Sequence, residues 1–273
     1  MKIMQNYFTK YLSAEIDPAY AKRAELILSS IEKLEPSTVL EIGCGRGFYL
    51  KAMQNIRSIK KIIGIDANQQ YIEIAKENCS KSVNIIQAKA ENIPVKDNSI
   101  ECVIISEVLE HVENDEVVLK EILRVLKPKG RLIVTVPNSN YPILWDPINW
   151  IMEKTLGRHV DKDRWWLAGI WADHERLYSK TQINALLVKF GFVVNVIEPV
   201  ITWSWPFMHF LLYGLGKNIV ERTHLLKSCN RFEPTQGPVP EFIAKITRMP
   251  SDLLDKGTSS ISVGWFISSE KQA

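Results

Sequence analysis

Residues 39–47 constrain the fold more than any other stretch, because an apolar run leads directly into glycines at alternate positions. The run ends at Ile42, and the glycines are Gly43, Gly45 and Gly47. Glycine has no Cβ atom, so the backbone here can adopt positive φ and approach a ligand closely. We therefore predict a buried strand, a tight turn, and a helix from about Phe48 whose N-terminal amides face an anionic group of the ligand.

Glu41 lies just before this turn and narrows the choice of ligand. A carboxylate at a strand end favours a cationic or hydrogen-bond-donating group and argues against a diphosphate. The pattern E-x-G-x-G-x-G also differs from the dinucleotide fingerprint G-x-G-x-x-G, which disfavours a nicotinamide-dependent oxidoreductase. The alternative interpretation is a strand-to-helix turn whose glycines serve packing alone.

Apolar runs and helical patterns alternate along most of the chain. The predicted strands after 39–42 are 62–65, 83–87, 101–106, 131–136, 192–197 and 260–268. The predicted helices cover 20–34, about 69–79 with Asn68 as cap, 119–126 and 180–190, and residues 127–130 are predicted to form a turn. Strands that alternate with helices indicate βαβ units, so we expect an α/β fold with a doubly wound, largely parallel sheet.

The amino-acid composition is that of an ordinary globular protein and excludes few functions. The chain has 273 residues, 46% of them hydrophobic and 24% charged, and a formal net charge of +3, which is too small to indicate a nucleic-acid partner. The four cysteines show no metal-binding or redox spacing, which favours a reduced, cytoplasmic compartment. We predict neither a signal peptide nor a spanning helix, since the apolar region 201–215 is interrupted and falls short of about 20 residues.

Two aromatic inserts interrupt the regular pattern. Seven of the eight tryptophans lie between residues 145 and 205, and none lies between 37 and 137. We interpret the inserts as irregular segments that form a substrate cover over a cofactor platform. The predicted division is 1–137 for the first five strands, 138–173 for the first insert, 174–198 where the core resumes, 199–258 for the second insert and 259–273 for the closing strand.

Polar residues follow several of the predicted strands, at the edge where open α/β sheets bind ligands. Asp66 ends the second strand, where a carboxylate can accept bonds from two ribose hydroxyls; the alternative is a helix cap or turn residue. Glu91 follows the third strand and can accept a bond from an exocyclic amine; the alternative is a solvated loop carboxylate. Ser106 ends the fourth strand, and Glu107 follows it.

These features together resemble the class I S-adenosylmethionine-dependent methyltransferases, especially the small-molecule group called methyltransferase-11 or UbiE-like. The matching blocks are 39–47, 62–68, 88–94, 99–112 and 126–137. The resemblance covers roughly residues 20–137 and resumes at 174–197 and 264–268. It implies a Rossmann-like sheet of seven strands whose last strand runs antiparallel.

The resemblance also implies how the cofactor S-adenosylmethionine is held. The glycine turn passes under the methionine part, Glu41 anchors the amino end, and Asp66 binds the ribose hydroxyls. Ala67, Ala90 and Glu91 border the adenine, although the family often has Asp where Glu91 stands, and Ser106 and Glu107 line the floor near the sulfonium. The implied contacts are Glu41, Gly43, Cys44, Gly45, Gly47, Asp66, Ala67, Ala90, Glu91, Ser106 and Glu107.

The chemistry expected of such an enzyme is direct, in-line methyl transfer. The protein must hold the nucleophile about 3 Å from the methyl carbon and exclude water, and no metal is required. A general base is needed only for a hydroxyl or a protonated amine. His111 and His174 are the candidates for acceptor contact or proton acceptance; each has a structural role as its alternative.

We therefore expect an enzyme that methylates a small or lipid-like molecule at oxygen, nitrogen or carbon. A cofactor-binding scaffold without turnover is the alternative from another class. A nucleic-acid or protein methyltransferase is a further alternative. Residues 106–109 read Ser-Glu-Val-Leu rather than a tetrapeptide like Asn-Pro-Pro-Tyr, which disfavours methylation of the amino group of a nucleic-acid base. Residues 201–215 fit a lid core, an apolar substrate channel or a peripheral membrane contact. The sequence sets no oligomeric state.

Overall fold

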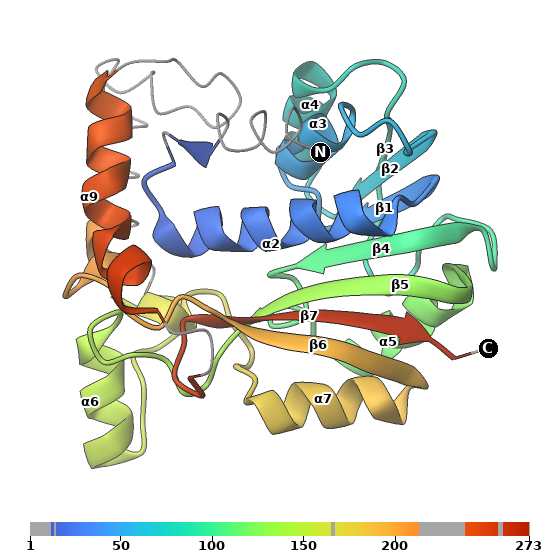
Figure 1. Ribbon diagram of the computed structural model, residues 1–273. Helices are drawn as coiled ribbons and strands as arrows, with labels where there is room; N and C mark the ends of the chain where they lie inside the picture. The colour runs from blue at the N-terminus through green and yellow to red at the C-terminus, as the bar shows by residue number, and fades with distance from the viewer. Residues whose placement is uncertain (1–11, 14, 165–166, 213–237, 256–258, 273) are drawn as a thin grey trace. The chain divides into compact units, whose positions relative to one another are not determined.

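The computed structural model describes residues 12–13, 15–164, 167–212, 238–255 and 259–272 (Figure 1). The first half contains α2 (Pro18–Leu34), β1 (Thr38–Ile42), α3 (Phe48–Met53), β2 (Lys61–Asp66), α4 (Gln69–Asn78), β3 (Asn84–Gln87), β4 (Ile100–Ser106), α5 (Asp115–Val125) and β5 (Leu126–Pro137). The second half contains α6 (Pro147–Leu156), the short 3-10 helix η1 (Gly169–Trp171), α7 (Lys180–Lys189), β6 (Phe192–Val200), α9 (Pro238–Leu254) and β7 (Gly264–Lys271).

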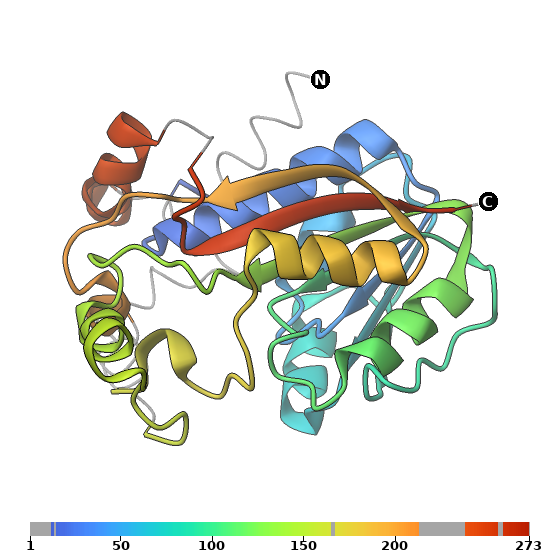
Figure 2. The same cartoon turned by 90° about the horizontal axis from the view of Figure 1, so that it is seen from below.

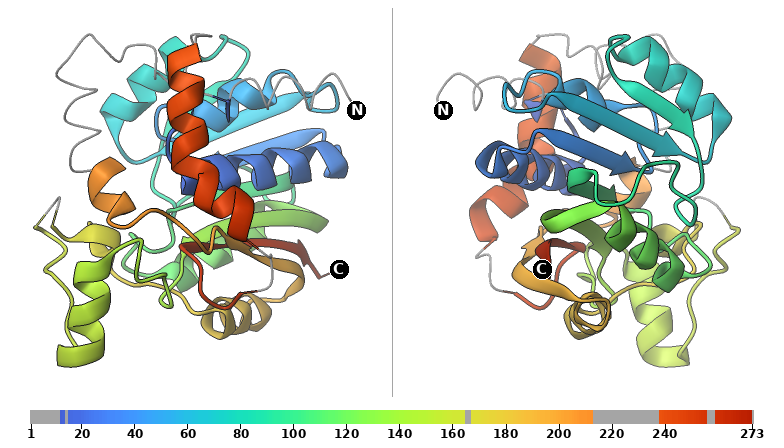
Figure 3. Two further views of the ribbon diagram at one scale, coloured as in Figure 1. Left: turned by 60° about the vertical axis from the view of Figure 1, so that its left-hand side comes forward. Right: turned by 90° about the vertical axis from the view of Figure 1, so that its right-hand side faces the viewer.

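The strands form one seven-stranded sheet in the order β3-β2-β1-β4-β5-β7-β6. The pairs β1–β2, β2–β3, β1–β4 and β4–β5 are parallel, and β7 runs opposite to β4 (Figure 1). Helices α2 and α5 lie on opposite faces of the sheet (Figures 2 and 3). The predicted doubly wound sheet with an antiparallel last strand is confirmed. The strand order reverses between β1 and β4, which is where open α/β sheets bind ligands.

The centre of the sheet is apolar on both faces. Leu40 and Ile42 of β1 and Val103, Ile104 and Ile105 of β4 are 0–1% exposed. Such continuous apolar strands are expected where helices cover both sides of a parallel sheet. This rigid centre positions the loops that leave the carboxyl ends of β1 and β4.

The chain divides into two compact units. Unit 1 comprises residues 1–25, 137–179 and 198–265, and unit 2 comprises 26–136, 180–197 and 266–273. Unit 2 therefore contains most of the sheet and all the candidate cofactor contacts. The five-part division expected from the sequence stays a prediction.

The predicted cap of α4 is confirmed, and the bounds of three strands are corrected. Asn68 caps α4, and its side chain accepts bonds from the N–H groups of Gln70 and Tyr71. The predicted turn at 127–130 instead lies within β5, where the register with β4 shifts and Lys129 adopts a φ of 62°. The closing strand begins at 264 rather than 260, and β6 continues through Val200.

Among their described residues, the inserts contain two α-helices in segments that were predicted to be irregular. Helix α6 begins after Asp146, whose side chain accepts a bond from the N–H of Asn149, and ends at Gly157 with φ 62°. Helix α9 includes Pro250 within it and has large apolar residues at helical spacing. Within the described residues, no helix is both long and apolar enough to cross a bilayer.

Candidate functional site

The glycine turn between β1 and α3 adopts a backbone that L side chains rarely reach. Gly43, Gly45 and Gly47 have φ values of 71°, 51° and 86°. A Cβ atom on Gly43 would lie 2.2 Å from Cγ2 of Val108, and one on Gly47 would lie 3.1 Å from Sγ of Cys79. A Cβ atom on Gly45 would meet nothing within 4 Å. Gly43 and Gly47 are thus required for packing, whereas the backbone of Gly45 faces open space.

Asp66, at the carboxyl end of β2, is joined to this turn. The N–H of Gly45 donates to Oδ2 of Asp66 at 2.8 Å, and the N–H of Asn68 donates to Oδ1 at 2.8 Å. Asp66 therefore makes a local turn contact, while the helix cap is Asn68. Each oxygen of a carboxylate can accept two bonds, so both oxygens retain capacity for a further donor such as a ribose hydroxyl.

Glu41 is a buried carboxyl group beneath the same turn. Its side chain is 3% exposed and accepts a bond from the N–H of Leu50 in α3. Burial, followed by the charge of Asp66, raises the pKa of Glu41 well above its usual value. Among the described residues, Oε2 of Glu41 has no hydrogen-bond partner. A buried carboxyl oxygen in that state suits a cationic or hydrogen-bond-donating ligand group.

Cys44 contributes its backbone, because its side chain points into the protein. The residue is 4% exposed, and its Sγ would lie 3.2 Å from a Cβ atom placed on Gly64 of β2. Its N–H donates to the carbonyl of Ile65 at 2.9 Å, as does the N–H of Gly43 at 2.8 Å. These two bonds fix the first half of the turn onto the end of β2.

The loop after β3 carries the candidate adenine contacts. Ala90 and Glu91 are half-buried, and Ala67, after β2, is exposed. The backbone N–H of Ala88 donates to the carbonyl of Asp66 at 3.0 Å. The side-chain amide of Gln87 donates through Nε2 to the carbonyl of Ala67 at 3.2 Å. The loop therefore starts beside the predicted ribose site.

Ser106 and Glu107, at the end of β4, are linked through Thr135 of β5. The hydroxyls of Ser106 and Thr135 lie 2.8 Å apart, and the Thr135 hydroxyl donates to Oε1 of Glu107 at 3.0 Å. The N–H of Glu107 also donates to the carbonyl of Thr135, and Glu107 has a positive φ of 54°. Thr135 was not among the predicted site residues, although its place on the strand neighbouring β4 was a usable signal.

The two candidate histidines lie in different units. His111 follows β4 in unit 2, is exposed, and has Nε2 4.0 Å from Oε1 of the buried Glu110. His174 follows η1 in unit 1, is half-buried, and its N–H donates to the carbonyl of Trp171 at 3.1 Å. Their involvement in proton transfer stays a prediction.

Unit 2 thus brings together the groups expected for a sulfonium nucleoside. Asp66 offers acceptors for a diol, Gly45 leaves room beside it, and the unpartnered Oε2 of Glu41 offers an acceptor for an amino group. On these observations the residues present fit S-adenosylmethionine.

Comparison with known proteins gives the family. The methyltransferase domain model Methyltransf_11 matches residues 40–134. A demethylmenaquinone methyltransferase of Lactobacillus johnsonii is 31% identical over 171 residues, which cover 58% of this chain and 68% of the relative. A ubiquinone/menaquinone biosynthesis C-methyltransferase UbiE of Haemophilus ducreyi is 32% identical over 134 residues, which cover 47% of this chain and 50% of the relative. The chain thus spans about half the length of that relative.

A solved structure agrees in fold. The S-adenosylmethionine-dependent methyltransferase of Thermotoga maritima is 19% identical, covers 93% of this chain and 92% of its own, and has a TM-score of 0.50. This likeness supports the fold alone, whereas the sequence relatives identify the family. The chain therefore belongs to the class I S-adenosylmethionine-dependent methyltransferases.

Proposed function

We propose that this protein transfers the methyl group of S-adenosylmethionine to a small, apolar acceptor by direct in-line displacement. The observation that carries this proposal is the bond from Gly45 to Asp66 beside the open space over Gly45. This bond holds the two carboxylate oxygens of Asp66 in place, next to the accessible backbone of Gly45. That arrangement suits the ribose and methionine parts of the cofactor.

The sulfonium of the cofactor supplies an activated methyl group. The residues of this chain bind and orient: Asp66 accepts bonds from the ribose hydroxyls, and Glu41 receives the amino group. The hydrogen bond from Thr135 holds the carboxylate of Glu107 in one orientation at the floor of the site. Holding the two reactants in line can supply about 7–11 kcal/mol of the barrier reduction, so fixed side chains suit transfer from an already activated donor.

The acceptor class is supported by the relatives and by the surface of unit 1. One relative is named a demethylmenaquinone methyltransferase, and another a C-methyltransferase of ubiquinone/menaquinone biosynthesis. Most of the large hydrophobic side chains that are exposed among the described residues belong to unit 1. We therefore favour a lipid-like acceptor and leave the methylated atom open.

We propose that a lipid-like acceptor is reached at a membrane surface, through residues 201–212 and α9. Phe242, Ile246, Met249 and Leu253 recur at helical spacing on one face of α9 and are exposed, whereas Ala244 on the opposite side is buried. This is the reverse of a surface helix in a soluble protein, which buries its large apolar face. Amphipathic helices that lie in a membrane interface expose such a face.

The preceding segment extends this apolar surface. Trp203, Trp205 and Phe207 are exposed, and the indole N–H of Trp205 donates to the carbonyl of Ile246 at 2.7 Å. Trp is enriched at membrane–water interfaces, and Trp and Phe are common on the apolar face of interfacial segments. Residues 213–215 of the predicted contact lie outside the described residues.

His111 and His174 remain our candidates for a general base if the acceptor carries a hydroxyl or a protonated amine. A carbon acceptor on an electron-rich ring needs only a group that removes a proton from that ring. His111 is exposed, whereas His174 is half-buried.

The function is tested by incubating the protein with methyl-tritiated S-adenosylmethionine and either demethylmenaquinone or a bacterial lipid extract. At a cofactor concentration below the wild-type dissociation constant, we expect label in the organic phase, strongly reduced in the Asp66→Ala variant and retained in Gly191→Ala, which alters unit 2 away from the site. Label in added RNA or protein, with none in the organic phase, would contradict the small-molecule acceptor. Cofactor binding without label in any pool would favour the scaffold alternative.

A further inference from the structure

Residues 88–97 follow β3 and carry Ala90 and Glu91, the candidate adenine contacts. The start of this loop is fixed, because the N–H of Ala88 donates to the carbonyl of Asp66 at 3.0 Å. The N–H of Asn92 donates to the carbonyl of Lys89 at 3.2 Å, which closes a turn around Ala90 and Glu91. The position of Glu91 therefore depends on what holds the far end of the loop.

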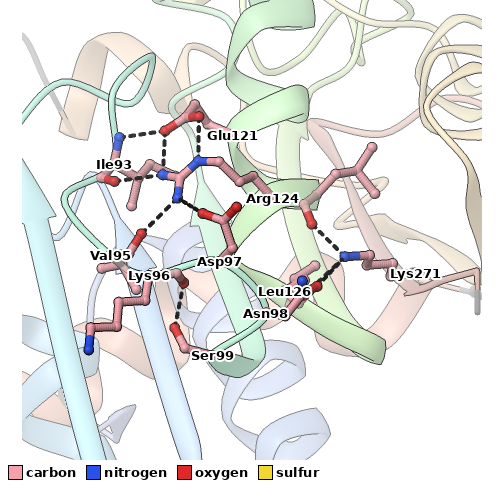
Figure 4. Close-up of polar contacts among 11 residues, drawn as sticks. Ile93, Val95, Lys96, Asp97, Asn98, Ser99, Glu121, Arg124, Leu126 and Lys271 are labelled. Atoms are coloured by element: carbon pink, nitrogen blue, oxygen red, sulfur yellow. Dashed lines mark hydrogen bonds and ion pairs between the residues drawn. The ribbon is translucent and has the colours of Figure 1, made fainter.

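Arg124 of α5 holds that far end through backbone atoms (Figure 4). Its Nη2 donates to the carbonyl of Ile93 at 2.8 Å, and its Nη1 donates to the carbonyl of Val95 at 2.8 Å. Nη1 also donates to Oδ1 of Asp97 at 2.6 Å. One guanidinium group thus contacts three residues of the loop.

Glu121, one turn earlier on α5, completes this contact. It receives two bonds from Arg124, one from Nε to Oε1 and one from Nη2 to Oε2, each at 2.7 Å. Its Oε2 also accepts the N–H of Ile93 at 2.9 Å, so both backbone polar groups of Ile93 are bound by the pair. The bond from Arg124 is the main cause that lowers the pKa of Glu121, so the carboxylate is charged at neutral pH.

The end of α5 that carries Arg124 is itself anchored. The ammonium of Lys271 in β7 donates to the carbonyls of Leu123 and Leu126, each at 2.7 Å (Figure 4). The carbonyl of Arg124 accepts the N–H of Asn98 at 2.9 Å. The loop is therefore tied to a helix end that is fixed to the sheet.

The geometry requires a guanidinium rather than a positive charge alone. The side chains of Arg124 and Glu121 are 31% and 19% exposed, and a partly exposed ion pair contributes little through charge. The planar fork of arginine can reach two carbonyls and a bidentate carboxylate together, which a lysine ammonium cannot. The contact is thus suited to fixing the shape of the loop.

We propose that Arg124 and Glu121 are positioning residues for adenine recognition. They hold the 88–97 loop so that Glu91 accepts a bond from the exocyclic amine of the cofactor. The inference rests on the proposed function, because it assumes that the adenine lies against this loop. It adds a role for residues of α5 that do not themselves contact the nucleoside.

The test compares the dissociation constants of S-adenosylhomocysteine and S-inosylhomocysteine, which has a carbonyl in place of the amine. Wild-type protein is expected to bind the adenine compound about tenfold more tightly, which is the effect of one charge-assisted bond. Arg124→Ala is expected to bring the ratio close to one, as is Glu91→Ala. Arg124→Lys is expected to restore the ratio only in part.

Arg131→Ala is the matched control. Arg131 is also 31% exposed in its side chain, pairs with Glu270 at 2.9 Å and donates to Asn195 at 2.7 Å, all within unit 2. It should lower thermal stability in a similar way yet keep the wild-type ratio. An unchanged ratio in Arg124→Ala, a changed ratio in Arg131→Ala, or no discrimination by wild type would overturn the proposal. Absence of any binding to wild type would instead overturn the proposed function.

Discussion

The backbone N–H of Gly45 donates to Oδ2 of Asp66 at 2.8 Å and joins the glycine turn to the end of β2. This bond makes the two halves of the candidate cofactor site a single unit. The turn cannot shift without moving the carboxylate, because Gly43 and Cys44 are also bonded to the carbonyl of Ile65. The site is therefore preorganised before any ligand binds.

Replacement of Asp66 by alanine should weaken cofactor binding. Two charge-assisted bonds to the ribose are lost, so we expect a loss of about 1–3 kcal/mol in binding free energy. Asp66→Asn, which keeps one acceptor oxygen, should lose less. Calorimetric titration with S-adenosylhomocysteine measures both, and an unchanged affinity of the alanine variant would count against the ribose role.

Gly45→Ala should lower affinity far more than stability. Alanine at a φ of 51° costs about 1 kcal/mol of backbone strain, and its methyl group would occupy the open space over the turn. Gly191→Ala is the matched control, since Gly191 has a φ of 79° and its Cβ would also meet nothing within 4 Å. Thermal midpoints should fall similarly, whereas only Gly45→Ala should lose cofactor affinity. Equal affinities of the two variants would refute the close approach at Gly45.

Glu41→Gln should stabilise the unliganded protein more at high pH than at low pH. The native state of the wild type retains the Glu41 proton to a higher pH than the unfolded chain does, since burial raises its pKa. Wild-type stability is therefore lost as pH rises from the unfolded pKa through the raised native value. The difference in thermal midpoint between variant and wild type should be larger at pH 8 than at pH 4.

The same variant should bind the cofactor less tightly at pH 8, because a neutral amide cannot pair with an ammonium group. Both measurements use one protein, so a folding defect would be detected directly. A pH-independent difference in thermal midpoint would show that Glu41 does not titrate as its burial indicates.

The membrane contact is tested by flotation with vesicles of phosphatidylcholine and phosphatidylglycerol. Joint replacement of Trp203, Trp205 and Phe207 by serine should abolish flotation of the protein, because buried aromatic area drives interfacial binding. The control replaces Val188, Val193 and Val196 by serine, which are exposed apolar residues of unit 2. Flotation that survives the first set of changes, or that is lost with the second, would rule out the proposed surface.

Most strands and helices of the sheet domain could be predicted from the sequence, because the residues that indicate each element lie close together in the chain. The apolar run before Gly43 is a strand, and Asn68 supplies its side-chain oxygen to the first amides of α4. Both depend on residues within a few positions of one another. The strand order around β1 and β4 follows from right-handed crossovers once the elements are recognised.

The contacts that build the site are not local, and the sequence does not contain them explicitly. The bond between Gly45 and Asp66 spans 21 residues, and the bond from Thr135 to Glu107 spans 28. Both arise from the side-by-side packing of strands. The inward direction of the Cys44 side chain likewise depends on the left-handed φ of Gly43 and Gly45.

The two missed helices have different causes. For α6 the signals were present, because Asp146 precedes Pro147 and Gly157 ends the segment in the left-handed conformation. For α9 the prolines obscured a regular spacing of Phe242, Ile246 and Leu253, and its apolar face is exposed rather than buried. Because the apolar face of α9 is exposed, it does not pack on a core, and the sequence offers no second apolar element that would identify it as a core helix.

A crystal structure with bound S-adenosylhomocysteine tests the central claim most directly. We predict both ribose hydroxyls within hydrogen-bond distance of Asp66, the amino group beside Glu41, and the methionine chain over the backbone of Gly45. A nucleoside bound anywhere else in the protein, with Asp66 contacting only Gly45 and Asn68, would contradict the account.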